Sequence, residues 1–156
     1  MKLRGFTLIE LVVTVAIVSI LATGILPVAK LAAQREKEKE LRASLRNMRE
    51  AIDAYKKFFD EGRIRKTPGQ SGYPPSLAVL VEGVADEKDP QKNKIRFLRK
   101  IPVDPMSIDP GIPAEQTWGL RSYASESNDP QAGDDVYDVY SLSPRNGLNG
   151  RPYSAW

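Results

Sequence analysis

An uncharged, mostly apolar run of 19 residues from Leu11 to Ala29 constrains this chain more than any other feature. At a rise of about 1.5 Å per residue, a helix of this length crosses the roughly 30 Å hydrocarbon core of a bilayer. The run therefore predicts a membrane-spanning helix near the N-terminus of a 156-residue chain. The remaining length suits one modest globular domain, because domains usually contain about 100–150 residues.

A cleaved secretory signal and a plain membrane anchor are the two simplest interpretations of this run. A secretory signal has an apolar region of only about 7–15 residues before its cleavage site, but this run continues directly into a charged segment. A plain anchor leaves Glu10 unexplained, because a carboxylate at the bilayer centre costs about 2.5–3.5 kcal/mol and normally has a partner and a function. The sequence shows no local partner for Glu10.

Cleavage between Gly5 and Phe6 would supply that partner. The new α-amino group of Phe6 would be a cation four residues before Glu10. The amine of one subunit could meet the Glu10 carboxylate of a neighbour displaced by about one helical turn, on the order of 5–6 Å. A buried charge pair of this kind specifies register more than it adds stability.

The segment from Lys2 to Glu10, with the sequence KLRGFTLIE, strongly resembles the class III signal of type IV pilins and type II secretion pseudopilins. The resemblance implies that a prepilin peptidase cuts after Gly5 and methylates the new amine of Phe6. Residues 1–5 would then be a removable leader. Glu10 would act in filament assembly.

The orientation of the chain in the membrane follows from the leader. Lys2 and Arg4 favour a cytoplasmic N-terminus by the positive-inside tendency. The resemblance agrees, and implies a single-pass protein of the bacterial inner membrane, with a transmembrane and assembly helix over residues 6–29 and a periplasmic C-terminal domain. We expect a helix kink or local melting between Gly24 and Pro27, because proline removes a backbone hydrogen bond. An ordinary tolerated kink is the alternative.

Beyond the membrane segment, apolar residues recur on one helix face at spacings of 4, 3, 4, 3 and 4. They are Leu41, Leu45, Met48, Ile52, Tyr55 and Phe59. We expect residues 30–62 to continue the first helix as an amphipathic half. The whole helix would run from Phe6 to Glu61 and stop at Gly62.

Charged residues fill the rest of this half, 15 of the 28 residues from Gln34 to Glu61. We interpret them as a solvated helix surface with same-face pairs such as Glu38 with Arg42. Contacts of residues 35–40 with neighbouring subunits in a filament are the alternative.

Residues 63–156 are expected to form the globular part, which begins with a loop and a short helix from Leu77 to Glu82. Two strand candidates follow, Thr117–Ser125 and Asp135–Ser143, and an antiparallel hairpin is their simplest arrangement. The expected fold class is α+β and pilin-like: a long N-terminal α-helix packed on a small antiparallel β-sheet.

Three further motifs resemble those of major pseudopilins of type II secretion systems. They are YPP at Tyr73–Pro75, LRKIPVDP at Leu98–Pro105 and YDVYSL at Tyr137–Leu142. With the N-terminal signal, this similarity spans nearly the whole chain and implies the same fold. One departure is Met106, which stands where the family usually has an aromatic residue.

A second departure concerns calcium, which major pseudopilins commonly bind with Asp oxygens in the loop after the last long strand. Here Ser143–Trp156 contains no Asp or Glu, although calcium prefers six to eight oxygens with carboxylates among them. We expect Tyr153 and Trp156 to close this loop by packing back on the sheet. The remaining metal candidates are Asp129, Asp134 and Asp135. A solvated acidic turn is the alternative interpretation of these three residues.

The chain contains no cysteine and no histidine, which excludes disulfides, thiolate nucleophiles and His-based acid–base catalysis. We therefore expect no enzyme. The formal charge of +3 falls further once Lys2 and Arg4 are removed, so nucleic acid is a poor partner.

The sequence therefore favours a structural subunit of a helical pseudopilus filament, assembled from the inner membrane to drive type II protein secretion. Its implied partners are further copies of itself, the prepilin peptidase, the inner-membrane assembly platform, other pseudopilins and membrane lipid. A major or minor subunit of a type IV surface pilus is one alternative. A membrane-anchored DNA-binding pilin is another, with a basic segment made of Lys92, Lys94, Arg96, Arg99 and Lys100.

Charge is uneven within the globular part. The segment from Asp86 to Lys100 has six basic residues against three acidic ones, and the segment from Thr117 to Ser143 has one against five. These segments could engage head to tail between subunits, which gives an open helical assembly when the rotation does not close. Ordinary surface charge is the alternative.

Overall fold

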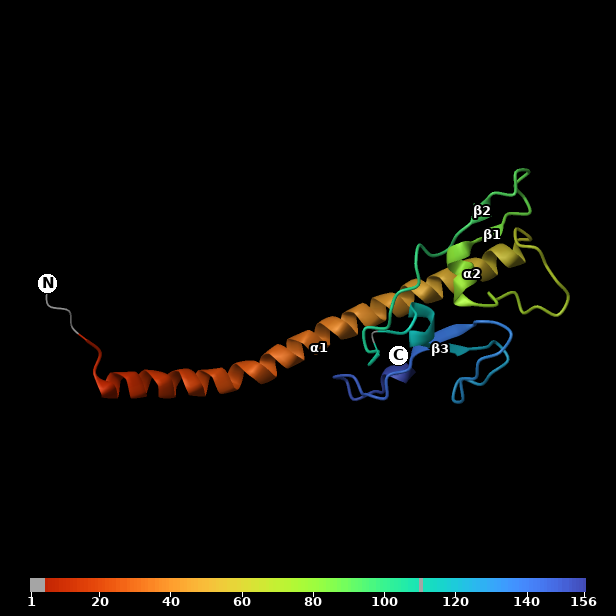
Figure 1. The fold of residues 1–156 in the computed structure, drawn as a ribbon. Coiled ribbons are helices and arrows are strands. Elements are labelled where there is room, and N and C mark those ends of the chain that lie inside the picture. Colours follow the sequence, from red (N-terminus) through yellow and green to blue (C-terminus); the bar gives the residue numbers. More distant parts are fainter. Residues whose placement is uncertain (1–4, 110) are drawn as a thin grey trace. The chain divides into compact units, whose positions relative to one another are not determined.

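One long helix runs through most of the N-terminal half of the chain (Figure 1). The computed structural model describes residues 5–109 and 111–156, without the side chains of residues 23–26. The chain divides into two compact units, residues 1–36 and residues 37–156, and α1 (Leu8–Asp60) contributes to both. The predicted span from Phe6 to Glu61 is therefore confirmed to within two residues at each end.

The core of the unit of residues 37–156 is built on the predicted apolar face of α1. All six residues of that face are buried, with exposed fractions between 0% and 9%. The core is completed by Ala51, Ile64, Leu77, Leu80, Leu98, Met106, Trp118, Val136, Val139 and Tyr153. Complete burial of one such side chain contributes about 1.5–3 kcal/mol, so this face fixes α1 to the domain. Met106 fills a core position with 1% of its surface exposed.

The short helix α2 (Leu77–Glu82) has the bounds that the sequence predicts. It ends at Gly83, whose φ of +79° is a conformation that favours glycine. A Cβ atom at Gly83 would lie 2.6 Å from the carbonyl oxygen of Ile95. Glycine is therefore required here by both backbone angle and space.

A two-stranded sheet that the sequence did not predict follows α2 directly. Strands β1 (Val84–Ala85) and β2 (Lys94–Ile95) pair antiparallel, with Val84 opposite Ile95. Strands of two residues are too short to show alternation, so periodicity could not reveal them.

The predicted C-terminal hairpin is confirmed, with shorter strands than expected. Strands β3 (Trp118–Arg121) and β4 (Asp138–Ser141) pair antiparallel, with Trp118 opposite Ser141 and Gly119 opposite Tyr140. A Cβ atom at Gly119 would lie 2.3 Å from the Tyr140 ring, so the ring packs across this glycine.

The strands end early because their flanking residues bond elsewhere. Thr117 belongs to a short 3-10 helix, η1 (Ala114–Thr117). On the other side, the Ser122 N–H donates to the Gln131 carbonyl at 2.9 Å. The Tyr123 N–H donates to the Asp135 carboxylate, also at 2.9 Å. Beyond Arg121, hydrogen bonds to a side chain and to a turn thus replace the hydrogen bonds between the two strands.

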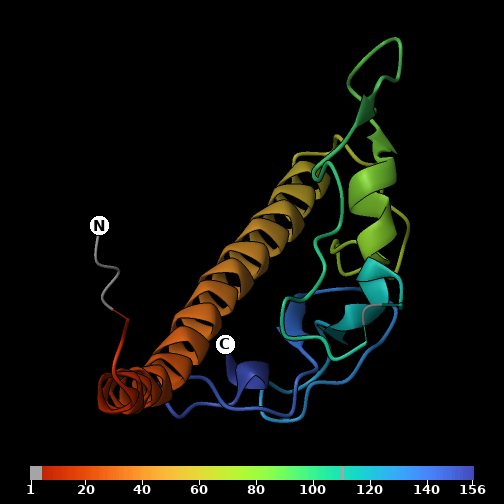
Figure 2. The same cartoon turned by 60° about the vertical axis from the view of Figure 1, so that its left-hand side comes forward.

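The PVDP segment lies in the loop before β3. Its residue Asp104, which is 2% exposed, connects this loop to strand β4. Its Oδ2 accepts a hydrogen bond from Ser141 Oγ at 2.5 Å, and its Oδ1 accepts one from the Met106 N–H at 2.7 Å. Within the unit of residues 37–156, α2, the β3–β4 sheet and the final 3-10 turn η2 (Tyr153–Ala155) all lie on one side of α1 (Figure 2).

Candidate processing and assembly site

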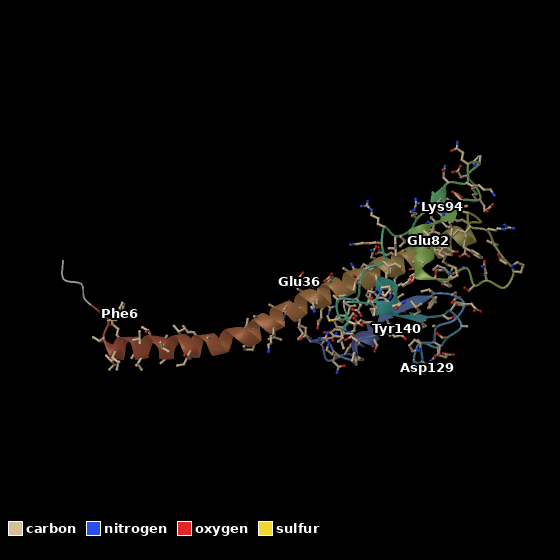
Figure 3. The ribbon with its side chains drawn as sticks, viewed as in Figure 1. Phe6, Glu36, Glu82, Lys94, Asp129 and Tyr140 are labelled. Carbon is tan, nitrogen blue, oxygen red and sulfur yellow. The ribbon has the colours of Figure 1, made fainter. Side chains whose placement is uncertain are left out.

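The bond between Gly5 and Phe6 lies in an exposed, non-helical segment just before α1 (Figure 3). Phe6 is 82% exposed, and a Cβ atom at Gly5 would meet nothing within 4 Å among the described residues. Nothing in the described fold thus requires glycine at position 5. Lys2 and Arg4, the basic residues of the predicted leader, lie outside the described residues.

Thr7 and Glu10 cap the first turn of α1. The Glu10 N–H donates to Thr7 Oγ1 at 3.3 Å, and the Thr7 N–H donates to Glu10 Oε2 at 3.4 Å. This reciprocal pair is a capping box, which satisfies two of the N–H groups that a helix start leaves without partners. The prediction that Glu10 has no local partner is therefore wrong, and the Thr-x-x-Glu spacing is the signal that reveals it. Glu10 remains exposed, so its carboxylate is still accessible to a second group.

The surface that follows the cap is apolar on every side. All described side chains from Phe6 to Ala22 and from Pro27 to Ala33 are exposed. The consecutive residues Leu11, Val12 and Val13 are 59%, 57% and 50% exposed, although successive helix residues point about 100° apart. By length and composition, α1 is the one described helix that could cross a membrane. An apolar surface of this extent needs lipid or other apolar helices around it.

Pro27 lies inside α1, which continues as a helix on both sides of it. Gly24 falls within residues 23–26, whose side-chain surroundings are outside the described part of the structure. The kink between Gly24 and Pro27 therefore stays a prediction.

The three acidic metal candidates do not form a cluster in the described part of the chain, where no three His, Cys, Asp or Glu side chains are placed to hold a metal ion. Asp129 accepts a hydrogen bond from Gln131 Nε2 at 2.8 Å. Asp135 caps the N–H of Tyr123, and Asp134 is exposed. Two of the three carboxylates thus serve local turn structure.

The C-terminal loop is closed by Glu38, an acidic residue of α1 with only 4% of its surface exposed. Its Oε1 accepts hydrogen bonds from the Leu148 N–H at 2.7 Å and from the Tyr153 hydroxyl at 3.0 Å. The loop therefore presents hydrogen-bond donors to this carboxylate, whereas calcium needs several oxygen acceptors. This arrangement does not fit calcium. The interpretation of Glu38 as part of a solvated surface is wrong.

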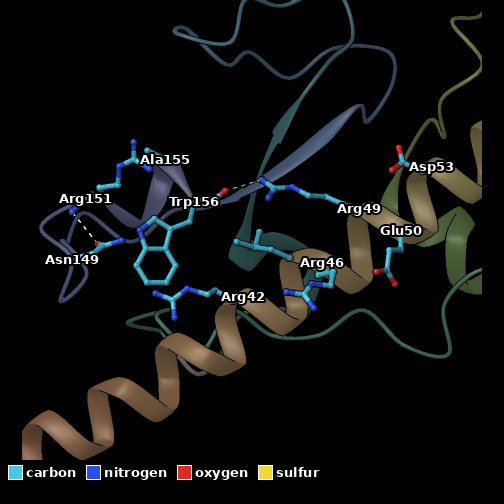
Figure 4. A pocket seen from close by; sticks show the side chains of 10 residues that line it. Arg42, Arg46, Arg49, Glu50, Asp53, Asn149, Arg151, Ala155 and Trp156 are labelled. Carbon is cyan, nitrogen blue, oxygen red and sulfur yellow. Dashed lines mark hydrogen bonds between the residues drawn. The ribbon is translucent and has the colours of Figure 1, made fainter.

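Trp156 packs against the same part of α1 (Figure 4). Its ring meets the Tyr153 ring edge-on at a centroid distance of 5.0 Å, and the Arg42 guanidinium lies 4.2 Å from the indole centroid. Arg49 Nη2 donates to the Trp156 carbonyl oxygen at 3.0 Å, and Arg49 Nε donates to Asp138 Oδ1 at 2.7 Å. Tyr153 is buried in η2, which contacts β4, so its predicted packing on the sheet is confirmed. The ring contacts of Trp156 are instead with Tyr153 and with Arg42 of α1.

Replacing Glu38 by alanine is expected to destabilise the globular part by about 2–5 kcal/mol, because a buried donor left without its acceptor costs about 1–3 kcal/mol. Glu38→Gln keeps an acceptor oxygen and is expected to cost less. The exposed Glu40 supplies the matched control, Glu40→Ala. Thermal unfolding of the detergent-solubilised protein measures all three. A rise in midpoint with added calcium, or a fall with a chelator, would contradict closure by Glu38.

The five basic residues of the proposed DNA-binding segment are all exposed. Lys94 lies in β2, and Lys92 Nζ is 3.5 Å from Glu87 Oε2. Exposure makes these residues available to an anionic partner of any kind, so it does not single out DNA.

Comparison with known proteins bears on the N-terminal site alone. A family model described as the prokaryotic N-terminal methylation motif matches residues 1–26, which include the Gly5–Phe6 bond and Glu10. No curated protein and no solved structure matches the chain. The match supports a structural subunit that is processed by a prepilin peptidase and assembles with others of its kind. The motif, together with the long N-terminal helix and the small antiparallel sheets that follow it, supports a type IV pilin-like protein.

Proposed function

We propose that this chain is a structural subunit of a helical pseudopilus, which is assembled from the bacterial inner membrane and drives type II protein secretion. The observation that carries the proposal is the first half of α1. The methylation motif covers the start of this helix, and the described apolar residues of the helix are exposed on all sides. Lipid before assembly and sister helices after assembly are the surroundings that such a surface needs.

The chain is organised to match. Residues 1–5 form the leader that the peptidase removes, and residues 6–29 form the transmembrane and assembly helix. Residues 30–62 are its amphipathic continuation, and residues 63–156 complete the globular part in the periplasm. Burial supports the distinction within α1, since side chains up to Ala33 are exposed wherever described and the buried face begins at Glu38.

Assembly is proposed to pair the Phe6 amine of one subunit with the Glu10 carboxylate of the next. Both residues are exposed at the start of α1, so a neighbouring helix can approach them. The capping box supports this role because it orients the Glu10 carboxylate at the helix start. In lipid, burying an unpaired carboxylate or an unpaired amine costs free energy. Both groups are therefore more stable when they form an ion pair with each other.

The pseudopilus is preferred over a surface pilus because of the C-terminal motifs. Asp104 of the PVDP segment and Ser141 of the YDVYSL segment bond to each other in the core, so two of the motifs work as one structural unit. The absence of cysteine also differs from adhesive pilins, in which a cysteine pair is common.

Deletion of the gene in its native host is expected to abolish protein secretion into the medium and to leave surface pili intact. Quantification of secreted proteins and of sheared surface filaments measures the two functions separately. Complementation with the wild-type chain should restore secretion. Loss of surface pili with normal secretion would show that the chain serves a surface pilus instead.

A further inference from the structure

The β1–β2 hairpin projects from the globular part (Figure 1). We call residues 86–97, which comprise the turn after β1, strand β2 and the two residues after β2, the basic turn. Asp89 fixes its conformation by accepting hydrogen bonds from the N–H groups of Gln91 and Asn93, at 2.9 and 3.2 Å. These hydrogen bonds, the first above all, lower the pKa of the Asp89 carboxyl from its ordinary value.

The acidic side chains of the basic turn form hydrogen bonds and ion pairs within their own subunit. Asp86 accepts two hydrogen bonds from the Arg63 guanidinium, at 2.5 and 3.2 Å, and these hold the pKa of its carboxyl below the ordinary value. Glu87 lies 3.5 Å from Lys92. The basic side chains of Lys88, Lys94 and Arg96 are exposed. The turn therefore presents positive charge outward on a preorganised backbone.

A cleft with complementary chemistry lies elsewhere on the same unit. We call it the tyrosine cleft. Its volume is about 430 Å³. It is lined by Pro68, Gly69, Gln70, Ser71, Tyr73 and Pro75 of one loop and by Ser122, Tyr123, Ala124, Asp134 and Asp135. Both charged residues of this lining are acidic. The loop from Glu126 to Asp135 adds Glu126 and Asp129, which are exposed.

The aromatic wall of the tyrosine cleft is preorganised. The rings of Tyr73 and Tyr123 stack at a centroid distance of 5.5 Å, and Tyr137 meets Tyr73 edge-on at 4.9 Å. Tyr123 is nevertheless 61% exposed, so one of its faces is available to a partner. Lys56 already lies 5.7 Å from the Tyr73 centroid and Arg121 lies 4.7 Å from the Tyr137 centroid, so Tyr123 is the ring that can take a cation from a partner. The ring quadrupole and the nearby carboxylates attract such a cation together.

The basic turn cannot reach the tyrosine cleft of its own chain. Lys94 of the basic turn and Asp129, in the acidic loop that leads to Asp134 and Asp135 of the cleft, lie on opposite sides of the unit of residues 37–156 in Figure 3. An ion pair between these surfaces therefore requires a second molecule.

We propose that the basic turn of one copy docks into the tyrosine cleft of a second copy. This inference rests on the proposed filament function and names a contact between the globular parts that adds to the Phe6–Glu10 pairing. The two surfaces differ, so the contact is heterologous, and repetition with a non-closing rotation builds an open helix. Complementary charge in such a contact fixes which surfaces meet.

Reversal of one charge on either surface tests this contact. Lys94→Glu and Asp134→Lys are each expected to lower the yield of filaments about fivefold, as expected for losing a partly exposed ion pair of up to about 1 kcal/mol. The variant with both reversals restores opposite charge in every contact, so its yield should return to within about twofold of wild type. Lys94 and Asp134 are exposed, and thermal unfolding checks that each variant is folded.

Two control variants separate this contact from a general effect of surface charge and from DNA binding. Lys100→Glu makes the same charge change on an exposed residue outside the basic turn, and it should leave the yield unchanged. Tyr123→Phe keeps the aromatic face and should assemble normally, whereas Tyr123→Ala should lower the yield of filaments as the single charge reversals do. A DNA-binding segment instead predicts that Lys94→Glu and Lys100→Glu both weaken binding to duplex DNA while filaments form normally.

Failure of the docking contact can be distinguished from failure of the proposed function. Normal filaments from both single reversals, or a double reversal no better than the single ones, would overturn docking and leave the proposed function standing. Absence of filaments from the wild-type chain together with normal secretion in the deletion strain would overturn both.

Discussion

Replacing Glu10 by alanine is expected to abolish filament assembly while leaving cleavage and membrane insertion intact. The variant removes a carboxylate that is exposed at the start of α1, and each assembled subunit would then hold an unpaired amine in an apolar environment. Breaking one partner of a buried ion pair costs about 3–5 kcal/mol, and this cost recurs at every subunit. The yield of filaments relative to processed subunits in the membrane measures the effect.

The capping box supplies two variants that separate charge pairing from helix capping. Glu10→Gln retains a side chain that suits a capping box but loses the negative charge, so it should fail to assemble as Glu10→Ala does. Thr7→Val removes the hydroxyl acceptor and keeps the charge, and it should assemble. The loss of a cap costs only about 0.5–2 kcal/mol. Normal filaments from Glu10→Gln would show that Glu10 acts as a cap and not as a docking charge.

Replacing Gly5 by leucine is expected to leave the leader attached to more than about nine-tenths of the protein. A Cβ atom at Gly5 meets no described atom within 4 Å, so the substitution should not disturb the subunit itself. The effect would therefore arise in the peptidase, which must approach the backbone of the scissile bond closely. Gel mobility of the membrane-bound protein separates precursor from mature subunit.

Leu3→Ala is the matched control, since it alters the leader away from the scissile bond, and it should be processed normally. A mature-length product from Gly5→Leu would contradict recognition of this glycine by the peptidase.

Periodic features of this fold could be predicted from the sequence. The face from Leu41 to Phe59 repeats over five intervals, and every member is buried. A long repeating pattern predicts which helix face is buried even when the packing partner is unknown, because any partner must bury the same face. The C-terminal bound of α2 could be predicted because Gly83, with its positive φ, stops the helix.

Features that depend on one distant contact could not be predicted in the same way. Asp104 and Glu38 are acidic residues, which are almost always exposed unless they are paired. Their donors, Ser141 for Asp104 and Tyr153 for Glu38, are 37 and 115 residues away. Glu38 stands three residues before Leu41, so extending the apolar face one step back would have indicated its burial.

At the N-terminus, the sequence predicted the site through its motif, and the structure added the cap. The hydrogen bonds between Thr7 and Glu10 are local and follow from the spacing of the two residues. Contacts that assembly would create involve other molecules, so one chain shows only the exposed surfaces that they would use.

The mass of the N-terminal peptide of the mature, filament-derived protein tests the central claim most directly. We expect a chain that begins at Phe6 and has one methyl group on its α-amine. A mature chain that retains residues 1–5, or that begins beyond the apolar run at Lys30, would contradict processing at the Gly5–Phe6 bond and assembly through the helix that follows it.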